Sequence, residues 1–241
     1  MKTLIADLHI HTCLSPCGEL TMSPRAIVDA ARRKGIQWIA ITDHNSARMV
    51  DAVAAAATAA GIHFTFGMEL QTREEVHLLA YFDTSSACHS FADAVYALLP
   101  DRCNQPDYFG DQVIVDAEET ILGFEKRLLL NSVDLSIDEA VDRVRASGGL
   151  PVPAHVDRDV YSLISQLGVV PEGLTFNLVE TISGNLPPGF GDAGPMCSSD
   201  AHELDQIGRR TTAFHVEEAT IEEMILAGRQ EGGRSATCRF A

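Results

Sequence analysis

The sequence predicts an α/β fold built on a parallel sheet or barrel, and three observations indicate it. Short apolar runs alternate with helix-forming segments along most of the chain, which is typical of parallel α/β folds. Polar residues follow these runs repeatedly, at the strand ends where such folds build their sites. The 241 residues, 46% of them hydrophobic, can bury a full core as one large domain or two small ones.

The first third of the chain supplies four expected strands. An apolar run at 4–6 ends at Asp7, and further runs lie at 38–41, 62–66 and 76–82. Ser23 and Pro24 predict the start of a helix that Gly35 ends. An alanine-rich helix ending at Ala60 fills the gap between the second and third strands.

Residues from about 84 to 135 interrupt this alternation. We expect a helix at 91–99, a polar loop at 100–110 and a hairpin made of 113–115 and 121–124. We interpret the segment as an insertion over the mouth of the main domain, where it is either a lid or a decoration without function.

The regular pattern resumes at Ser136, which forms a capping box with Glu139 and so predicts a helix start. Expected strands follow at 150–154 and at 176–179, the second ending at Glu180, and an apolar run at 195–197 leads to Asp200. A last strand is expected at 211–216. The helix after it should be capped by Thr220 with Glu223.

The charge and cysteine content restrict the partners and the compartment. A formal net charge of −16 argues against a protein that coats long nucleic acid, although bound metals could still attract a small phosphorylated substrate. Six scattered cysteines suggest a reducing compartment. The start has too short an apolar run for a signal peptide, and no stretch approaches a membrane span of roughly 18 apolar residues. We therefore expect a cytoplasmic protein with no membrane partner.

The stretch that follows the first expected strand carries the first chemical signal. Residues two apart on a strand point to the same face, so His9 and His11 project together and Asp7 joins them. Two imidazoles on one face make half of a metal site. Asp7 is expected to hold a histidine ring through its second nitrogen.

Further candidate ligands continue this pattern along the chain. Seven of the eight candidates lie at or just beyond the end of an expected strand, and the exception, His77, lies near the start of one. The candidates are His9, His11, His44, Glu69, His77, His155, Asp200 and His202. The other three histidines, at 63, 89 and 215, are expected to lie outside the site.

Five ordered motifs resemble those of the PHP superfamily, named after bacterial replicative polymerases and histidinol phosphatase. They are Asp7–Thr12, Ile41–Asn45, Gly67–Glu69, Pro153–His155 and Ser199–His202. The resemblance covers nearly the whole chain outside the insertion. It implies a single domain over 1–241, a distorted (β/α)7 barrel with an inserted segment, and a di- or trinuclear metal centre. Most members of the superfamily are phosphoesterases.

The resemblance also implies how the ligands are shared. A first metal takes His9, His11, Glu69 and Asp200. Glu69 bridges to a second metal, which also takes His77 and His155. A third metal takes His44, His202 and a residue of the loop after His11. Cys17 stands six positions past His11 and is our candidate for that loop ligand; the alternative is Glu19 or water.

The ligand types leave zinc, manganese and iron open for the two to three divalent ions. Coordination lowers the pKa of water from 15.7 to roughly 7, so a metal-bound hydroxide is the expected nucleophile. His202 or Asp43 could donate the leaving-group proton. Arg158 is a candidate phosphate clamp, unless it forms only a surface salt bridge with Asp157 or Asp159.

Three functions remain open from the sequence. The first is a metal-dependent phosphoesterase acting on a small phosphorylated metabolite or nucleotide. The second is a nuclease or exonuclease acting on nucleic-acid ends. The third is a non-catalytic metal-bound module that supports a partner protein, a version that degraded ligands would favour.

Overall fold

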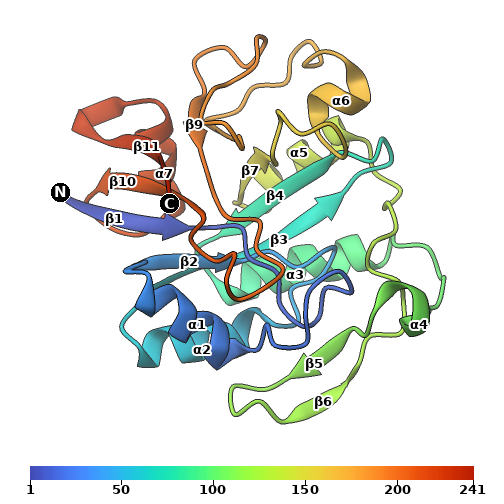
Figure 1. The fold of residues 1–241 in the computed structure, drawn as a ribbon. Coiled ribbons are helices and arrows are strands. Elements are labelled where there is room, and N and C mark those ends of the chain that lie inside the picture. Colours follow the sequence, from blue (N-terminus) through green and yellow to red (C-terminus); the bar gives the residue numbers. More distant parts are fainter.

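The computed structural model describes residues 1–241 as a mixed α/β fold around a strongly curled sheet (Figure 1). Its strands are β1 Lys2–Asp7, β2 Trp38–Ile41, β3 His63–Gln71, β4 His77–Phe82, β5 Val113–Val115, β6 Ile121–Phe124, β7 Leu150–Pro153, β8 Leu178–Glu180, β9 Gly194–Met196, β10 Arg210–Val216 and β11 Ser235–Phe240. Its helices are α1 Pro24–Arg33, α2 Val50–Ala59, α3 Ser85–Tyr96, α4 Pro106–Phe109, α5 Ile137–Ala146, α6 Leu163–Leu167 and α7 Ile221–Gly228, with a 3₁₀ turn at Glu231–Gly233.

Seven strands form one sheet in the order β11-β10-β1-β2-β3-β4-β7, and β8 and β9 pair separately. Neighbours β1, β2 and β3 are parallel, whereas β3–β4, β4–β7, β1–β10 and β10–β11 are antiparallel. One apolar cluster contains inward-facing side chains from the seven-stranded sheet and from the β8–β9 pair. Among them are Trp38, Tyr81, Leu178 and Phe214, together with Leu8 just after β1. The β8–β9 pair therefore closes the curled sheet into a distorted barrel, as expected for the fold class.

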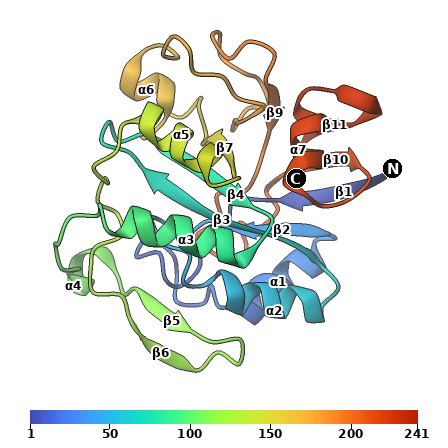
Figure 2. The ribbon, with the colours of Figure 1, turned by 180° about the vertical axis from the view of Figure 1, so that it is seen from behind.

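Alternating side chains of the same strands face the helices outside the barrel. Ile39 and Ile41 of β2 pack with α1 and α2, while Leu78 and Phe82 of β4 pack under α3 and α5. Seen from behind, α3 and α5 cover that outer face of the sheet (Figure 2). None of the helices has the length and apolar character that a membrane crossing requires.

The expectation of a parallel sheet is wrong at β4 and also at β10, which pairs antiparallel with β1. Only residues 72–76 connect β3 to β4, and a parallel crossover needs about a dozen residues or more. The two strands therefore form an antiparallel hairpin. The expected last strand is also not the last, because β11 follows it as an edge strand in which no residue is fully buried.

Other expected elements agree with the structure. Ser136 and Glu139 form the predicted capping box of α5, and the hydroxyl of Thr220 accepts a hydrogen bond from the Glu223 amide at the start of α7. Glu223 does not complete a second capping box, because its carboxylate accepts from the Glu217 amide and pairs with Arg234.

The segment 84–135 contains the expected helix, which begins earlier at Ser85, and the expected antiparallel hairpin β5–β6, which projects from the body (Figure 1). Its helix α3 and its later residues, including Phe91, Val95 and Leu129, belong to the main core cluster. Its role as an insertion or lid stays a prediction.

Candidate metal centre

The direction of the strands brings the candidate ligands to one edge of the barrel. His9 and His11 follow β1, His44 follows β2, Glu69 lies in the last part of β3, and His155 follows β7. These four strands point the same way, so their carboxyl ends share that edge. Because β4 runs the opposite way, its first residue, His77, lies at the same edge. The reversed direction of β4 therefore explains why His77, at the start of its strand, lies with ligands that follow the ends of theirs.

The carboxylate of Glu69 lies at the centre of the site, only 1% exposed. Its Oε1 is 2.8 Å from His77 Nδ1 and 3.3 Å from both His9 Nε2 and His155 Nε2. Its Oε2 is 3.0 Å from His44 Nδ1 and 3.4 Å from His11 Nε2. Each oxygen thus faces its own group of rings, which is the arrangement that a bridging carboxylate requires.

The far nitrogens of four rings are held by acceptors. His9 Nδ1 lies 2.9 Å from Glu180 Oε2, and His77 Nε2 lies 3.0 Å from Gln71 Oε1. His11 Nδ1 lies 3.0 Å from the hydroxyl of Ser15, which itself donates to Asp43, and His202 Nδ1 lies 3.1 Å from the carbonyl of Asp200. In a neutral ring, these acceptors fix the proton on the far nitrogen, so the near nitrogen faces the centre as a lone pair.

The facing lone pairs fit metal ions. Two ligands at 2.0–2.1 Å from a tetrahedral ion stand about 3.4 Å apart. His9 Nε2 and His11 Nε2 are 3.2 Å apart, and His77 Nδ1 and His155 Nε2 are 3.3 Å apart. His44 Nδ1 is buried and forms no hydrogen bond. Three groups of residues could each hold a metal ion, because the ligand atoms inside each group lie within 4.8 Å of one another. The first group is His9, His11 and Glu69, the second is His44, Glu69 and His77, and the third is His11, Cys17, His44 and His202.

Cys17 lies in the third of these groups, as the sequence suggested. Although the residue is exposed, burial of its thiol raises the Cys17 pKa, and the charges of Glu69 and Asp200 raise it further. A cation between these groups would reverse that effect, because metal coordination favours the thiolate. The alternative ligand Glu19 belongs to none of the three groups, and its carboxylate accepts from Thr21.

The pKa values describe ionised carboxylates and, at His11, His44 and His77, neutral rings. Burial disfavours the charged form of His9, but the charges of Glu180 and Glu69 raise its pKa well above its usual value. Burial would raise the pKa of Glu69, but His77 and His9 hold it well below its usual range. Burial likewise opposes ionisation of Asp200, yet His9 and His11 keep its pKa well below normal. Burial lowers the pKa of His11 to about 4 and that of His44 well below its usual value. Ionised carboxylates and neutral imidazoles are the forms that bind divalent ions.

Asp200 connects the centre to Arg158. Its Oδ1 is 3.4 Å from the Nε2 atoms of both His9 and His11, and its Oδ2 is 3.1 Å from Arg158 Nη1. Arg158 therefore pairs with a candidate ligand and not with Asp157 or Asp159. Asp157 instead accepts hydrogen bonds from residues 181–183.

The carboxylate of Asp7 does not have its expected role, and Glu180 has that role instead. Asp7 does not hold a histidine ring: its oxygens accept from the backbone amides of Ser199 and Gly208 at 2.8 Å, and burial raises its pKa to about 6. Glu180 takes that role for His9, and it also accepts from the His155 amide at 3.0 Å. Glu180 lies at the end of β8, as most candidate ligands lie at the ends of other strands. This position is the sequence signal that could have identified Glu180 as a site residue.

Asp43 lies behind the centre and not in it. It is 1% exposed, and its oxygens accept from the Thr12 amide and hydroxyl at 2.8 Å and from the Ser15 hydroxyl at 2.7 Å. With both oxygens bonded and no path to substrate, Asp43 positions the Ser15–His11 pair and cannot serve as the proposed proton donor.

The other three histidines lie outside the centre, as expected. His63 contacts Lys2, His89 pairs with Asp51 and His215 contacts Thr3.

Two of the site residues have strained backbones. His155 and Asp200 have φ angles of 32° and 52°, in a region that non-glycine residues rarely adopt. Such conformations are typical of functional sites, where the surrounding contacts hold them.

The centre opens into a cavity of about 220 Å³. It is lined by Cys17, His44, Glu69, Gln71, His77, Leu130, Arg158, Tyr161, Asp200 and His202. Leu130 is the one contribution of the segment 84–135. The β5–β6 hairpin does not line the cavity.

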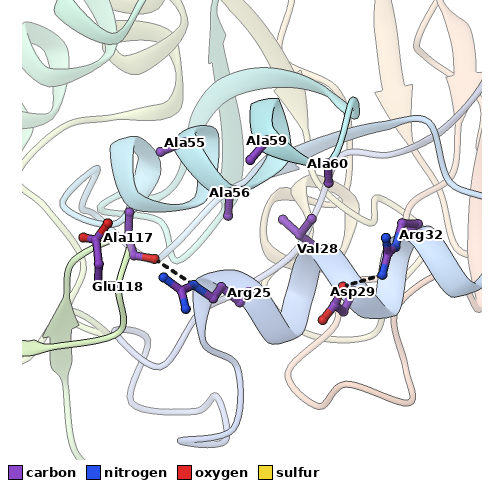
Figure 3. Close-up of a pocket in the computed structure, with 10 residues that line it drawn as sticks. All are labelled: Arg25, Val28, Asp29, Arg32, Ala55, Ala56, Ala59, Ala60, Ala117 and Glu118. Atoms are coloured by element: carbon purple, nitrogen blue, oxygen red, sulfur yellow. Dashed lines mark hydrogen bonds and ion pairs between the residues drawn. The ribbon is translucent and has the colours of Figure 1, made fainter.

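A larger cavity, about 410 Å³, lies between α1, α2 and the loop at Ala117 and Glu118 (Figure 3). Its arginines are already engaged, Arg25 with the carbonyl of Ala117 and Arg32 with Asp29. It contains none of the candidate ligands, so chemistry places the site in the smaller cavity.

Fold and site together define a distorted α/β barrel with a centre of histidines and carboxylates at the carboxyl ends of its strands. The model of the PHP domain family matches residues 7–143, more than half of the chain, and the chain belongs to that family.

Known proteins resemble the chain to different extents. The lesion-specific endonuclease PfuEndoQ from Pyrococcus furiosus has a TM-score of 0.72 at 18% identity; the match covers 98% of this chain and 58% of the endonuclease. A candidate metal-dependent phosphoesterase from Bifidobacterium adolescentis has a TM-score of 0.54 at 20% identity, over 82% of this chain and 87% of the other. At these identities the likeness establishes the fold.

One sequence relative is an uncharacterized protein of Methanocaldococcus jannaschii. It is 36% identical over 77 residues, which are 29% of this chain and 45% of the relative. The chain therefore spans only about half the length of this relative and of the endonuclease.

The ligand geometry generates a prediction about metal content. We expect about two to three divalent ions per chain after metal-replete expression, and fewer in His9→Ala, because His9 faces both Glu69 and Asp200. Elemental analysis measures the content. His215→Ala, at a histidine outside the centre, is the matched control. Less than one ion per chain in the unmodified protein would contradict the assignment.

Cys17 provides a second, spectroscopic prediction. In cobalt-substituted protein, a thiolate ligand gives a near-ultraviolet sulfur-to-cobalt band, and Cys17→Ser should remove that band and weaken one ion selectively. Cys103→Ser, at an exposed cysteine outside the centre, should leave the spectrum unchanged. An unchanged band in Cys17→Ser would remove Cys17 from the ligand set.

A third prediction concerns Glu180, which contacts the candidate ligand His9 but belongs to none of the three candidate ligand groups. Glu180→Gln should lower the metal affinity about 10- to 100-fold, because the amide holds the His9 ring less strongly than the carboxylate. Competition with a chelator measures the affinity, and exposed Glu172→Gln is the control. Equal affinities in the two variants would refute the role of Glu180.

Proposed function

We propose that the chain is a metal-dependent phosphoesterase that hydrolyses a small phosphorylated substrate. The observation that carries the proposal is the convergence of five histidines on the Glu69 carboxylate beside a cavity that also contains an arginine. Divalent ions held there would activate water near neutral pH and neutralise phosphoryl oxygens as charge develops.

The chain's own residues would bind and orient the phosphate. As the family resemblance implies, His9, His11, Glu69 and Asp200 would hold one ion, Glu69 with His77 and His155 would hold a second, and Cys17, His44 and His202 would hold a third. Arg158 lies at the mouth with its side chain 40% exposed, so its remaining N–H groups can reach a phosphate while one binds Asp200.

The leaving-group proton would come from water in the cavity. Asp43 is enclosed, and His202 donates from Nδ1 to the Asp200 carbonyl, so its Nε2 would be the atom that holds an ion. Neither of the two predicted donors is therefore free for proton transfer.

The size and charge of the molecule support a small substrate. The cavity of about 220 Å³ lies below the 300–1,000 Å³ typical of sites for drug-sized ligands, so it fits a phosphate group and little more. A net charge of −16 disfavours a long polyanion.

A nuclease is the second candidate, and the fold match of 98% of this chain to part of a lesion-specific endonuclease favours it. That endonuclease is longer than this chain, so residues outside the matched part could contact its nucleic acid. The complete ligand set argues against the third reading, a non-catalytic module.

Phosphate release tests the proposal. Metal-loaded protein should hydrolyse nucleotides, sugar phosphates or an aryl phosphate, and Glu69→Gln should reduce turnover at least about 100-fold, because the neutral amide no longer holds two cations together. Glu172→Gln serves as the control. Near-normal turnover in Glu69→Gln would remove that residue from the reaction. Release of nucleotides from nucleic-acid ends, with no phosphate from any of the small esters, would support the nuclease instead.

A further inference from the structure

The loop from His155 to Tyr161 places three kinds of side chain around the cavity. His155 faces Glu69, Arg158 pairs with Asp200, and Tyr161 lines the mouth. The cavity therefore receives a metal ligand, a cation and an aromatic ring from seven consecutive residues.

The backbone of this loop is fixed at both ends. The His155 amide donates to Glu180, and the Arg158 amide donates back to the His155 carbonyl at 2.9 Å. The Ser162 hydroxyl donates to the Arg158 carbonyl at 2.8 Å, and the His77 amide donates to the Tyr161 carbonyl at 3.0 Å. Arg158 and Tyr161 are thus held in a preorganised position relative to the centre.

Tyr161 is held in an unusual conformation with its ring partly free. Its φ of 56° lies in the left-handed region, which a bulky residue rarely adopts without supporting contacts. One face of its ring stacks on His77, with centroids 4.9 Å apart and planes 9° apart. The residue is nevertheless 39% exposed, so the ring remains accessible from outside the cavity.

We propose that Tyr161 is a specificity-determining residue that stacks on the planar base of a nucleotide whose phosphate lies at Arg158 and the metal centre. The inference rests on the proposed phosphoesterase function and names its substrate class. A cavity of about 220 Å³ accommodates the phosphate, and the organic group must then lie across the mouth, where Tyr161 is. Bases stack on exposed aromatic rings without requiring hydrogen bonds to identify them.

A binding experiment separates this role from support of His77. Two phosphonates, in which a methylene replaces the ester oxygen, bind without being hydrolysed; one carries adenosine and the other glycerol. Metal-loaded protein should bind the adenosine phosphonate more tightly in calorimetry. Tyr161→Ala should weaken that binding at least about 5-fold and change binding of the glycerol phosphonate less than about 2-fold.

Two variants serve as controls, and elemental analysis provides a second readout. Tyr161→Phe keeps the ring and should retain the preference, while Tyr108→Ala, at a tyrosine 80% exposed outside the cavity, should behave as the unmodified protein. Equal weakening of both ligands in Tyr161→Ala, or loss of metal from it, would show that Tyr161 acts only by supporting His77. No preference for adenosine in the unmodified protein would also overturn the inference.

These outcomes are independent of turnover. An absence of phosphate release from every ester would refute the phosphoesterase, whereas the binding preference of the phosphonates is measured without catalysis.

Discussion

The structure depends on one electrostatic constraint: the lone pairs gathered around the Glu69 carboxylate must be separated by cations. His77 Nδ1 approaches Glu69 Oε1 to 2.8 Å, while the other nitrogen of that ring is held by the Gln71 carbonyl oxygen. An unprotonated nitrogen and a carboxylate oxygen repel each other at that distance, and burial removes the water that would weaken the repulsion. The same conflict recurs at His11. Metal binding should therefore contribute directly to the stability of this edge of the barrel.

The strand directions follow from the need to bring ligands to that edge. The parallel strands β1, β2 and β3 and the strand β7 deliver their ligands after their carboxyl ends. Strand β4 contributes a ligand from its first residue because the hairpin reverses it. A uniformly parallel barrel would place His77 at the opposite end of the sheet. The antiparallel pairs, which look like irregularities of the barrel, are thus what completes the ligand set around Glu69.

The sequence predicted the centre better than its support. Histidines and carboxylates that follow apolar runs are visible as a pattern, and the structure brings all eight candidates and Cys17 to one place. The residues that hold the rings are less visible, because Ser15, Gln71 and Glu180 are ordinary residue types whose roles depend on contacts between distant segments. Asp7 shows the converse, since its position beside His9 suggested a contact that the backbone amides of Ser199 and Gly208 take instead. The antiparallel direction of β4 could have been predicted from the short connection at 72–76. The regular alternation of apolar runs favoured a parallel strand instead.

The division of labour around the cavity suggests where specificity can vary. The ligands are buried, mutually dependent and fixed by strand ends, so a change in one disturbs the others. Arg158 and Tyr161 lie on a loop, at the mouth, and are 40% and 39% exposed. A loop that is anchored to the centre at His155 and to α6 at Ser162 can exchange the side chains between these anchors without moving the ligands. Under the proposed function, the centre would cleave the phosphate ester. The residues between 155 and 162 would then select the organic group that the ester carries, and the fold alone does not decide between a small nucleotide and the end of a polymer.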